Sequence, residues 1–216
     1  TKSTLVIVPM SVLGQWQDEI RKRTTAGVLT FAEYYGNSVP SDPSSTSSNG
    51  GSGGGGSGGG GSAAFKSLGY LCTHDVVLTT YGTISAEMQR LKNKNKTFTA
   101  TKGLLSINWR RVVLDESHII RNRATLTAKA CYAVRATRRW CLTGTPFQNS
   151  IDDIFSLVIF LKHEPWSEPL WWNKVIKKSV KKGTISDHVL QKDENNNIKM
   201  LRVVLEPIML RRTKSE

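Results

Sequence analysis

The chain has 216 residues and a formal net charge of +13, from 30 Lys and Arg against 17 Asp and Glu. This length suits one α/β domain or a piece of a larger protein, and the basic excess predicts an anionic partner such as nucleic acid. The three cysteines lack C-x-x-C spacing and the four histidines are dispersed, which argues against a disulfide framework and a metal cluster. No apolar run is long enough to span a membrane, and no stretch resembles a signal peptide.

A compact apolar run, Thr4–Val8, predicts the first buried strand, which Pro9 ends. Ser11 is a predicted N-cap for a helix over residues 12–21, where apolar and polar side chains alternate at helical spacing. A second strand is expected over residues 28–35. The chain therefore begins with the strand–helix–strand pattern of an α/β domain.

Residues 38–62 form a low-complexity segment that passes from Pro, Ser and Asn into repeats of G-G-G-G-S. Such a composition cannot bury enough apolar surface to fold, so we expect a flexible tether without chemistry, either engineered or a natural insertion. The predicted organisation is therefore the start of one domain at residues 1–37, this loop at 38–62, and the rest of the domain at 63–216.

The stretch R-R-V-V-L-D-E-S-H, at residues 110–118, is the centre of the prediction. Its β-branched run predicts a strand buried on both faces, and it ends in two acids, Asp115 and Glu116. Because chemistry in open α/β sheets lies just past the carboxyl ends of the strands, these acids are candidates for holding Mg²⁺ and orienting a water. Two acids that favour a helix N-terminus are the simpler alternative.

The next predicted strand, residues 138–142, ends in T-G-T-P-F-Q-N at residues 143–149. Thr143 and Thr145 supply short hydroxyl side chains around Gly144, which lets the backbone turn and another group approach closely. Further helices are expected over residues 83–91, 126–134, 152–162 and 198–212, with a strand over 75–81. Alternating strands and helices predict a parallel sheet covered by helices on both faces.

Taken together, D-E-S-H and L-T-G-T-P-F-Q-N resemble two boxes of the SWI/SNF family of helicase-like ATPases in superfamily two. The second box matches at every defined position, from Leu142 to Asn149, and the first departs only at Ser117, where Gly or Ala is usual. The resemblance covers nearly the whole chain outside the low-complexity segment. It implies a RecA-like three-layer fold, truncated, in which this chain is a fragment of the first lobe.

The resemblance also implies roles for named residues. Asp115 would hold Mg²⁺, Glu116 would polarise the attacking water, and His118 would relay the nucleotide state. ATP and Mg²⁺ are the implied cofactors. The residues expected to couple hydrolysis to movement are Thr143, Gly144, Thr145, Gln148, Asn149, Arg121 and Asn122.

In the same family the boxes P-x-S-V-L-x-Q-W and T-T-Y lie along the DNA track. This implies backbone contacts to double-stranded DNA from Ser11, Thr79, Thr80 and Tyr81. The segments I-I-R-N-R, F-L-x-x-E-P-W and L-E-P-I-M-L-R-R-T-K resemble the branch that holds helicase-like transcription factor and the fungal post-replication repair translocases. A nuclear protein is then expected, acting on chromatin or on replication-fork proteins, with no membrane.

The expected activity is therefore ATP-driven translocation on double-stranded DNA, for remodelling or repair. No G-x-x-x-x-G-K-[ST] loop occurs in the chain, so the fragment alone is expected to be inactive. A basic, non-catalytic DNA or chromatin docking module is the first alternative. An RNA helicase lobe is disfavoured, because that group typically carries S-A-T where this chain has T-G-T. The sequence does not indicate the remodelling target or a neighbouring RING domain.

Overall fold

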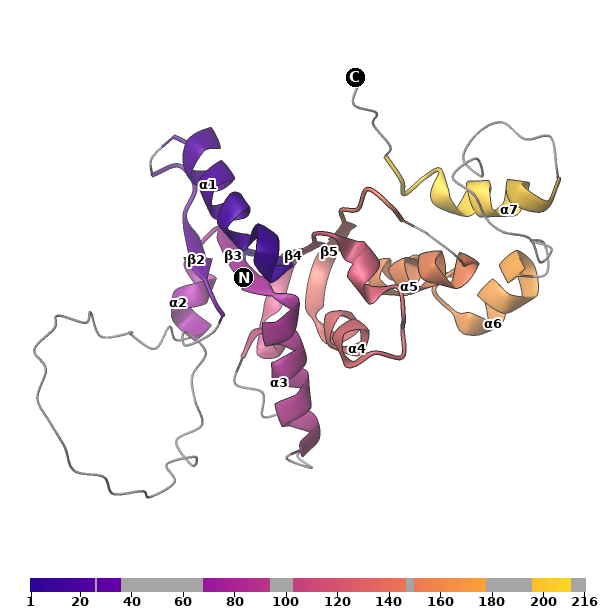
Figure 1. Cartoon of the computed structure of the whole chain (residues 1–216), viewed down its shortest axis with the longest axis horizontal. Helices are drawn as coiled ribbons and strands as arrows, with labels where there is room; N and C mark the ends of the chain where they lie inside the picture. The colour runs from indigo at the N-terminus through magenta and orange to yellow at the C-terminus, as the bar shows by residue number, and fades with distance from the viewer. Residues whose placement is uncertain (26, 36–67, 94–102, 147–149, 178–195, 211–216) are drawn as a thin grey trace, which may run out of the picture. The chain divides into compact units, whose positions relative to one another are not determined.

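The computed structural model describes the chain except for residues 26, 36–67, 94–102, 147–149, 178–195 and 211–216 (Figure 1). The predicted loop at 38–62 and the candidates Gln148 and Asn149 lie outside the described residues. The chain divides into two compact units. Unit 1 comprises Thr1–Val112 with Val134–Arg138, and unit 2 comprises Val113–Ala133 with Arg139–Glu216.

Five strands form one sheet in the order β2-β3-β1-β4-β5. Strand β3 pairs in parallel with both β1 and β2, and the β1 register runs from Thr4 opposite Val76 to Val8 opposite Thr80. These findings confirm the predicted α/β class. The strands are β1 (Thr4–Val8), β2 (Phe31–Glu33), β3 (Val76–Thr80), β4 (Asn108–Leu114) and β5 (Arg135–Cys141).

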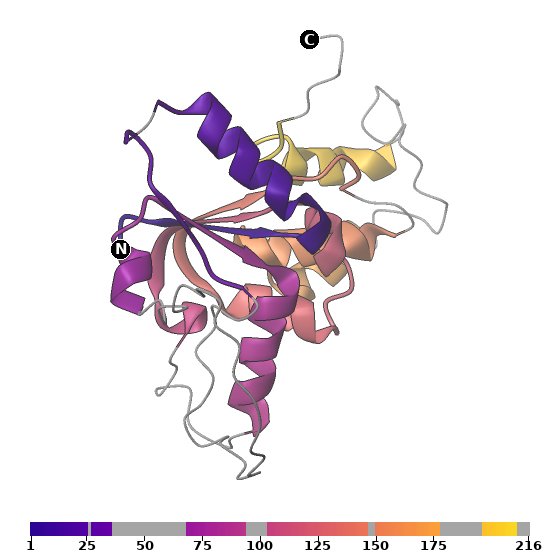
Figure 2. The same ribbon diagram turned by 60° about the vertical axis from the view of Figure 1, so that its left-hand side comes forward.

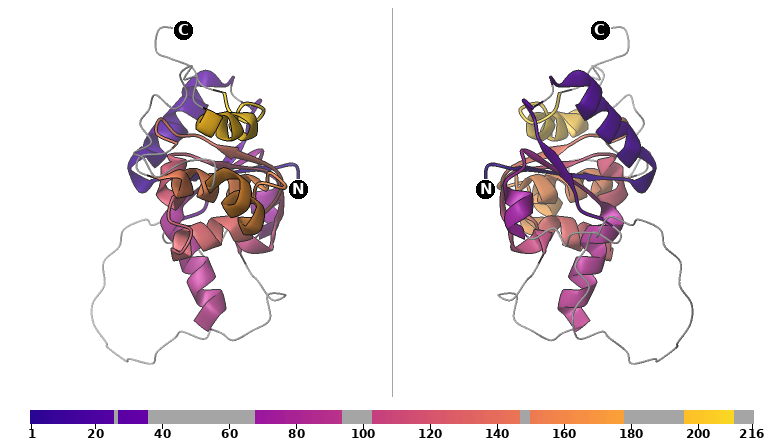
Figure 3. Two further views of the ribbon diagram at one scale, coloured as in Figure 1. Left: turned by 90° about the vertical axis from the view of Figure 1, so that its right-hand side faces the viewer. Right: turned by 90° about the vertical axis from the view of Figure 1, so that its left-hand side faces the viewer.

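In unit 1, helices α1 and α3 lie on opposite faces of strands β1 and β3 (Figures 2 and 3). The central strands are almost completely buried, as expected of parallel strands covered on both sides. The helical segments of this unit are η1 (Met10–Val12), α1 (Leu13–Arg23), α2 (Leu68–Cys72), α3 (Tyr81–Asn93) and η5 (Leu104–Ser106).

A buried carboxylate, Glu87 on α3, joins three parts of unit 1. It is 7% exposed and accepts hydrogen bonds from the backbone N–H groups of Leu104 (3.1 Å) and Leu105 (3.3 Å), and from the Tyr34 hydroxyl. Burial raises the pKa of Glu87, and these hydrogen bonds offset part of that effect. A Cβ on Gly103 would come within 2.6–2.7 Å of this carboxylate, so the site requires glycine there.

Unit 2 is built around helix α5 (Ile151–Leu161), where seven of eleven residues are buried. Ser150 caps it by accepting a hydrogen bond from Asp152 N (3.2 Å), and Asp152 and Asp153 occupy its first turn. This confirms the predicted apolar helix that packs into a core. The other helical segments are η6 (Ser117–Ile120), α4 (Leu126–Ala133), α6 (Pro169–Trp171), the π-helix η7 (Trp172–Lys177) and α7 (Asn196–Leu205).

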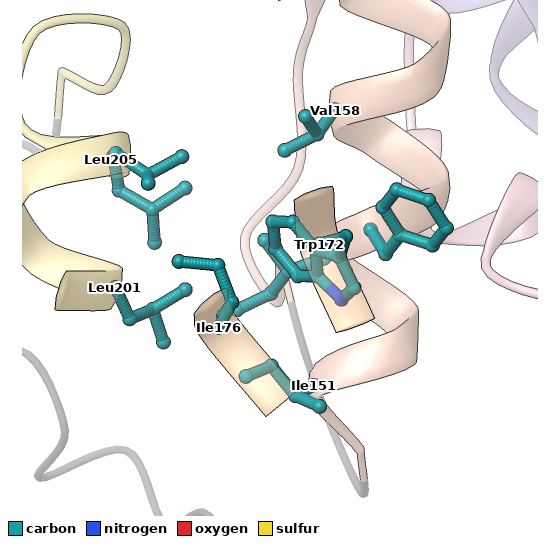
Figure 4. Packing of buried hydrophobic residues seen from close by; sticks show 9 residues of the cluster. Ile151, Val158, Trp172, Ile176, Leu201 and Leu205 are labelled. Atoms are coloured by element: carbon teal, nitrogen blue, oxygen red, sulfur yellow. The ribbon is translucent and has the colours of Figure 1, made fainter. Parts of the chain in front are cut away.

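The core of unit 2 gathers side chains from α5, η7 and α7 around Trp172 (Figure 4). The Trp172 ring is fully buried and stacks on Phe155, with ring centroids 4.8 Å apart and an interplanar angle of 19°. Its neighbour Trp171, by contrast, is 51% exposed. Lys177 Nζ lies 2.8 Å from Asp152 Oδ2, which ties the end of η7 to the start of α5.

Three predicted boundaries are wrong, each for a local reason. Ser11 does not cap a helix: after Pro9 the chain first makes a 3-10 turn, Val12 N donates to Pro9 O, and α1 begins at Leu13. Strand β2 is shorter than predicted, because a turn at residues 27–28, where Gly27 has a φ of +84°, precedes it.

The last helix, α7, ends at Leu205 rather than continuing to residue 212. Pro207 follows two residues later, and proline lacks the N–H that a continuing helix needs. Among the described residues, none of the helices combines the length and the apolarity that crossing a membrane would require.

Candidate active site

Strand β4 delivers Asp115 and Glu116 to its carboxyl end, as predicted. Leu114 is fully buried, whereas both acids are half-buried, so the chain leaves the core at this point. Glu116 N donates to Asp115 Oδ1 (2.9 Å), and Glu116 has left-handed dihedrals, φ 48° and ψ 49°. A non-glycine residue in this region costs about 1–2 kcal/mol, so the turn holds local strain at the two acids.

His118 lies against the second acid. Its Nδ1 atom is 3.1 Å from Glu116 Oε2, and the two side chains are 34% and 45% exposed. The pair is close enough for an ion pair when the imidazole is protonated, although the ring nitrogen makes no well-directed hydrogen bond. The structure therefore brings together Asp115, Glu116 and His118 in one partly solvated group.

The end of β5 is joined to this group through the backbone. Leu142 N donates to Leu114 O (2.8 Å), and Ser117 N donates to Leu142 O (2.9 Å). The residue before Thr143 is thus held between the last residue of β4 and the residue after Glu116. The two boxes that the sequence singles out meet at this hydrogen-bonded step.

Ser117, the departure from the family pattern, is fully buried and its hydroxyl makes no full hydrogen bond. Because the position is fully buried, a larger side chain would have to displace its neighbours, so a small residue is favoured there. The neighbouring Cys141 is half-buried, and burial raises the pKa of its thiol to about 12, while the Ser117 hydroxyl and Arg139 act in the opposite direction.

The T-G-T-P segment leaves open space beside it. Thr145 N donates to Thr143 Oγ1 (3.1 Å), which folds the segment back on itself. A Cβ on Gly144 would meet no atom within 4 Å, and Gly144 and Thr145 are exposed. The segment therefore has room for an approaching group, the role that the sequence predicts for Gly144.

Arg121 and Asn122 have different surroundings: Asn122 hydrogen-bonds within a turn, whereas Arg121 is exposed. The Asn122 side chain accepts a hydrogen bond from Ala124 N (3.0 Å), and its carbonyl accepts from the Thr125 hydroxyl (2.9 Å). Asn122 therefore shapes the turn before α4, which is a structural use of a residue predicted to couple motion. Arg121 is exposed at the end of η6.

The predicted DNA contacts lie in unit 1 and are mostly buried. Thr79 is fully buried and its hydroxyl donates to Tyr34 O (2.7 Å), so that hydroxyl is not available to a phosphate. Thr80 accepts from Thr83 N (3.2 Å), as an N-cap side chain does, and Tyr81 is 6% exposed. Ser11 is exposed and is the member of this set that could meet a phosphate directly.

The donor set fits a metal that is shared with phosphate groups. Within the described part of the chain, no group of three or more His, Cys, Asp and Glu side chains could form an all-protein cage. Mg²⁺ is usually bound through one or two carboxylates, with phosphate oxygens and waters completing its shell. Asp115 and Glu116, half-buried at a strand end, supply carboxylates of that number and kind.

The sequence did not indicate a role for two hydroxyl groups in unit 2, those of Ser156 and Tyr132. Ser156 and Tyr132 hydrogen-bond to each other between α5 and α4, and Ser156 also bonds to η6. The available signal was a single hydroxyl, Ser156, inside the apolar run I-F-S-L-V-I-F-L. A lone polar residue on the buried face of a helix needs a hydrogen-bond acceptor nearby.

The whole chain, residues 1–216, matches the family model described as the SNF2-related domain. The chain belongs to the SNF2-related domain family. This confirms the resemblance drawn from D-E-S-H and L-T-G-T-P-F-Q-N. The parts that the structure describes are thus those of an SNF2-related domain.

Curated relatives of this SNF2-related domain are DNA repair proteins. The chain is 35% identical over 211 residues to DNA repair protein RAD5A of Arabidopsis thaliana, covering 98% of the chain and 17% of the relative. It is 37% identical over 217 residues to DNA repair protein RAD5 of Debaryomyces hansenii, covering 100% and 16%. The chain thus spans about a sixth of the length of these relatives.

Among solved structures, the Sulfolobus solfataricus SWI2/SNF2 ATPase core in complex with dsDNA matches with a TM-score of 0.62 and 26% identity. The match covers 100% of this chain and 34% of that chain. The same core domain, described without DNA, matches with a TM-score of 0.58. The α/β sheet is therefore that of an SNF2 ATPase core, a RecA-like fold, as predicted.

Proposed function

We propose that this chain forms most of the first lobe of an ATP-driven translocase on double-stranded DNA, acting in DNA repair or chromatin remodelling. One observation carries the proposal: the Asp115–Glu116–His118 group is bonded through Ser117 N to Leu142 O, directly before the T-G-T-P segment. Family membership and the DNA-bound structural relative support it. A nuclear location, and partners in chromatin or at replication forks, belong to the same proposal.

In this proposal each acid has its own role. Asp115 holds the metal, with the Glu116 N–H bonded to Oδ1 fixing its orientation. Glu116 orients the attacking water and takes its proton, and its left-handed backbone conformation is the one in which the carboxylate lies beside His118. Bound Mg²⁺ supplies electrostatic stabilisation of the charge that develops on the phosphates.

Coupling follows the backbone contacts between the two boxes. When the Glu116–His118 contact changes, the Ser117 N–H moves with η6 and pulls on Leu142, which begins the T-G-T-P segment. Thr143, Gly144 and Thr145 then rearrange into the open space beside Gly144. Arg121 extends the same path at the end of η6, and Gln148 and Asn149 are proposed to complete the T-G-T-P-x-Q-N box.

The decisive experiment replaces each acid in the full-length protein that contains this chain. Glu116→Gln should bind ATP nearly normally yet hydrolyse it on the order of a hundredfold more slowly, because an amide takes no proton. Asp115→Asn should weaken Mg²⁺-dependent ATP binding itself. DNA-stimulated ATPase rates and nucleotide binding are measured together, with the exposed Glu164→Gln as a matched control. Near wild-type turnover in Glu116→Gln would overturn the proposed mechanism.

DNA binding is proposed to use the phosphate backbone without regard to sequence, through Ser11, while the buried Thr79, Thr80 and Tyr81 support the fold of unit 1 and do not themselves reach a phosphate. The affinity should fall steeply with salt, because phosphate contacts release counterions. Ser11→Asp should lower duplex affinity, whereas Thr25→Asp, on another exposed turn of unit 1, should change it little. An affinity that stays constant through a salt titration, or equal losses in the two variants, would contradict this assignment.

A further inference from the structure

Helix α5 carries a buried hydroxyl group, that of Ser156, among apolar core residues. Ser156 is 0% exposed, and its helix neighbours Phe155 and Leu157 are core residues. A buried hydroxyl without a hydrogen bond costs about 1–3 kcal/mol, so an apolar residue would be the simpler choice at this position. What Ser156 contacts therefore shows what it does.

Ser156 joins three elements at one oxygen atom. Its hydroxyl donates to the backbone carbonyl of Ile120, the last residue of η6. Because a serine hydroxyl has a single proton, the Tyr132 hydroxyl on α4, 2.5 Å away, must donate to Ser156 Oγ. Burial raises the pKa of Tyr132, which keeps that phenol protonated as a donor.

The two helical segments joined in this way adjoin the two halves of the candidate site in sequence. Segment η6 begins directly after Glu116 and contains His118. Helix α5 begins at Ile151, one residue beyond the T-G-T-P-F-Q-N box in sequence, with Ser150 as its cap, and Ser156 lies in its second turn. The Ser156–Ile120 bond is thus a second connection between the boxes, separate from the Ser117–Leu142 backbone bond.

Helix α5 is also braced on a side other than Ser156. Phe155 stacks on Trp172 and also lies 5.1 Å from the Arg123 guanidinium, while Asp152 pairs with Lys177. A helix held this firmly moves as one body, so a pull on Ile120 reaches the start of α5 instead of being absorbed along it.

We infer that Ser156 is a positioning residue that couples the η6 segment, with Glu116 and His118, to helix α5 and the T-G-T-P box. The inference rests on the proposed function. Ser156 touches no reacting group. It makes hydrolysis responsive to DNA by making η6 and α5 move together, and Tyr132 keeps the Ser156 hydroxyl turned towards Ile120.

The test compares three variants of the full-length protein: Ser156→Ala, Tyr132→Phe and the double variant. The readout is the ratio of the ATPase rates with and without duplex DNA, measured at a temperature where all variants are folded. The melting temperature of each variant is measured separately. Ser156→Ala should lower the ratio about tenfold while leaving the DNA-free rate within about twofold. Tyr132→Phe keeps the bond to Ile120 and should keep most of the stimulation.

The double variant separates coupling from simple packing. It removes the Tyr132 hydroxyl that Ser156→Ala leaves without an acceptor, so its melting temperature should recover relative to Ser156→Ala. If Ser156 couples the two segments, the DNA stimulation should stay low in the double variant despite that recovery. A ratio that recovers together with the melting temperature, or an unchanged ratio in Ser156→Ala, would overturn the inference.

Glu116→Gln in the same assay distinguishes the two levels of failure. If Glu116→Gln abolishes turnover and Ser156→Ala keeps full DNA stimulation, the inference fails and the proposed function stands. If Glu116→Gln retains turnover, the proposed function itself fails, whatever the Ser156 variants do.

Discussion

The molecule places acidic residues in two contrasting settings, Glu87 in unit 1 and the Asp115–Glu116 pair in unit 2. Glu87 is 7% exposed, and its carboxylate accepts hydrogen bonds from two backbone N–H groups and a tyrosine. Asp115 and Glu116 are half-buried, and Glu116 sits on strained backbone. The difference teaches that burial and hydrogen-bond saturation, rather than the presence of a carboxylate, separate an acid that holds the fold from one that can take a ligand.

The largest expected effect on stability comes from removing the structural acid, Glu87. Glu87→Ala leaves the N–H groups of Leu104 and Leu105 buried without acceptors, at about 1–3 kcal/mol each. We expect the free energy of unfolding to fall by about 2–5 kcal/mol. Glu116→Ala, the matched change at the functional acid, should stay within about 0.5–1 kcal/mol. Equal losses in chemical denaturation would show that the two settings do not differ as described.

Substituting Gly103, beside Glu87, and Gly144, in the T-G-T-P segment, tests the same difference between the two settings without removing a charge. Gly103→Ala would place a Cβ 2.6–2.7 Å from the Glu87 carboxylate and should lower the stability by about 1–3 kcal/mol. Gly144→Ala meets open space and should leave the stability almost unchanged, while lowering DNA-stimulated ATPase activity. Thermal melts and ATPase assays of both variants check that Gly103→Ala lowers the stability and that Gly144→Ala lowers the activity.

Glu87 should also make unit 1 sensitive to pH. Its pKa is raised by burial, so between its ordinary value and the raised value the folded state binds more protons than the unfolded state. The stability that protonation provides is fully present below the unfolded pKa and is lost as the pH rises through the folded pKa. Glu87→Gln should flatten this part of the pH–stability curve, and an unchanged curve in that variant would show that Glu87 is not the source of the pH dependence.

The strained backbone at Glu116 predicts a smaller change of opposite sign. Glu116→Gly relieves the left-handed dihedrals and should raise the stability by up to about 1 kcal/mol, while removing the carboxylate that hydrolysis needs. A gain in melting temperature together with lost turnover would mark this residue as one whose conformation is kept for function. A loss of stability would place Glu116 beside Glu87 as a structural acid.

A similarly small effect is expected from the low-complexity segment. Deleting residues 41–61 should shift the free energy of unfolding by only about 1 kcal/mol, because loop-closure entropy changes slowly with length. The deletion tests whether the stability of unit 1 depends on the Glu87 network rather than on the connecting chain. Loss of cooperative unfolding would show that the segment is more than a tether.

Much of the fold could be predicted from local pattern. The apolar run Thr4–Val8 is strand β1 at the predicted bounds, and the apolar D-D-I-F helix is α5 with its acids in the first turn. The two boxes meet because adjacent parallel strands bring their carboxyl ends to one edge. These features depend on residues that are close in sequence or on the regular geometry of a sheet.

The rest depends on contacts that no local pattern encodes. Glu87 resembles any polar residue on a helix until Leu104 and Leu105 close over it, 17 and 18 residues later. Thr79 was a candidate for phosphate contact, yet its hydroxyl is taken by a carbonyl 45 residues away. Ser11 failed as an N-cap because Pro9 starts a 3-10 turn first. In each case a tertiary or neighbouring contact outweighs the residue's own preference.

The distribution of the three thiols has a practical consequence for following this domain in solution. Cys131 is buried in the core and Cys141 is half-buried, and burial raises the pKa of both thiols, so few thiolates form there near neutral pH. Cys72, at the end of α2, is exposed. A maleimide dye should therefore react first at Cys72, giving a fluorescent reporter of unit 1 in the native chain, without substituting any residue of the candidate site.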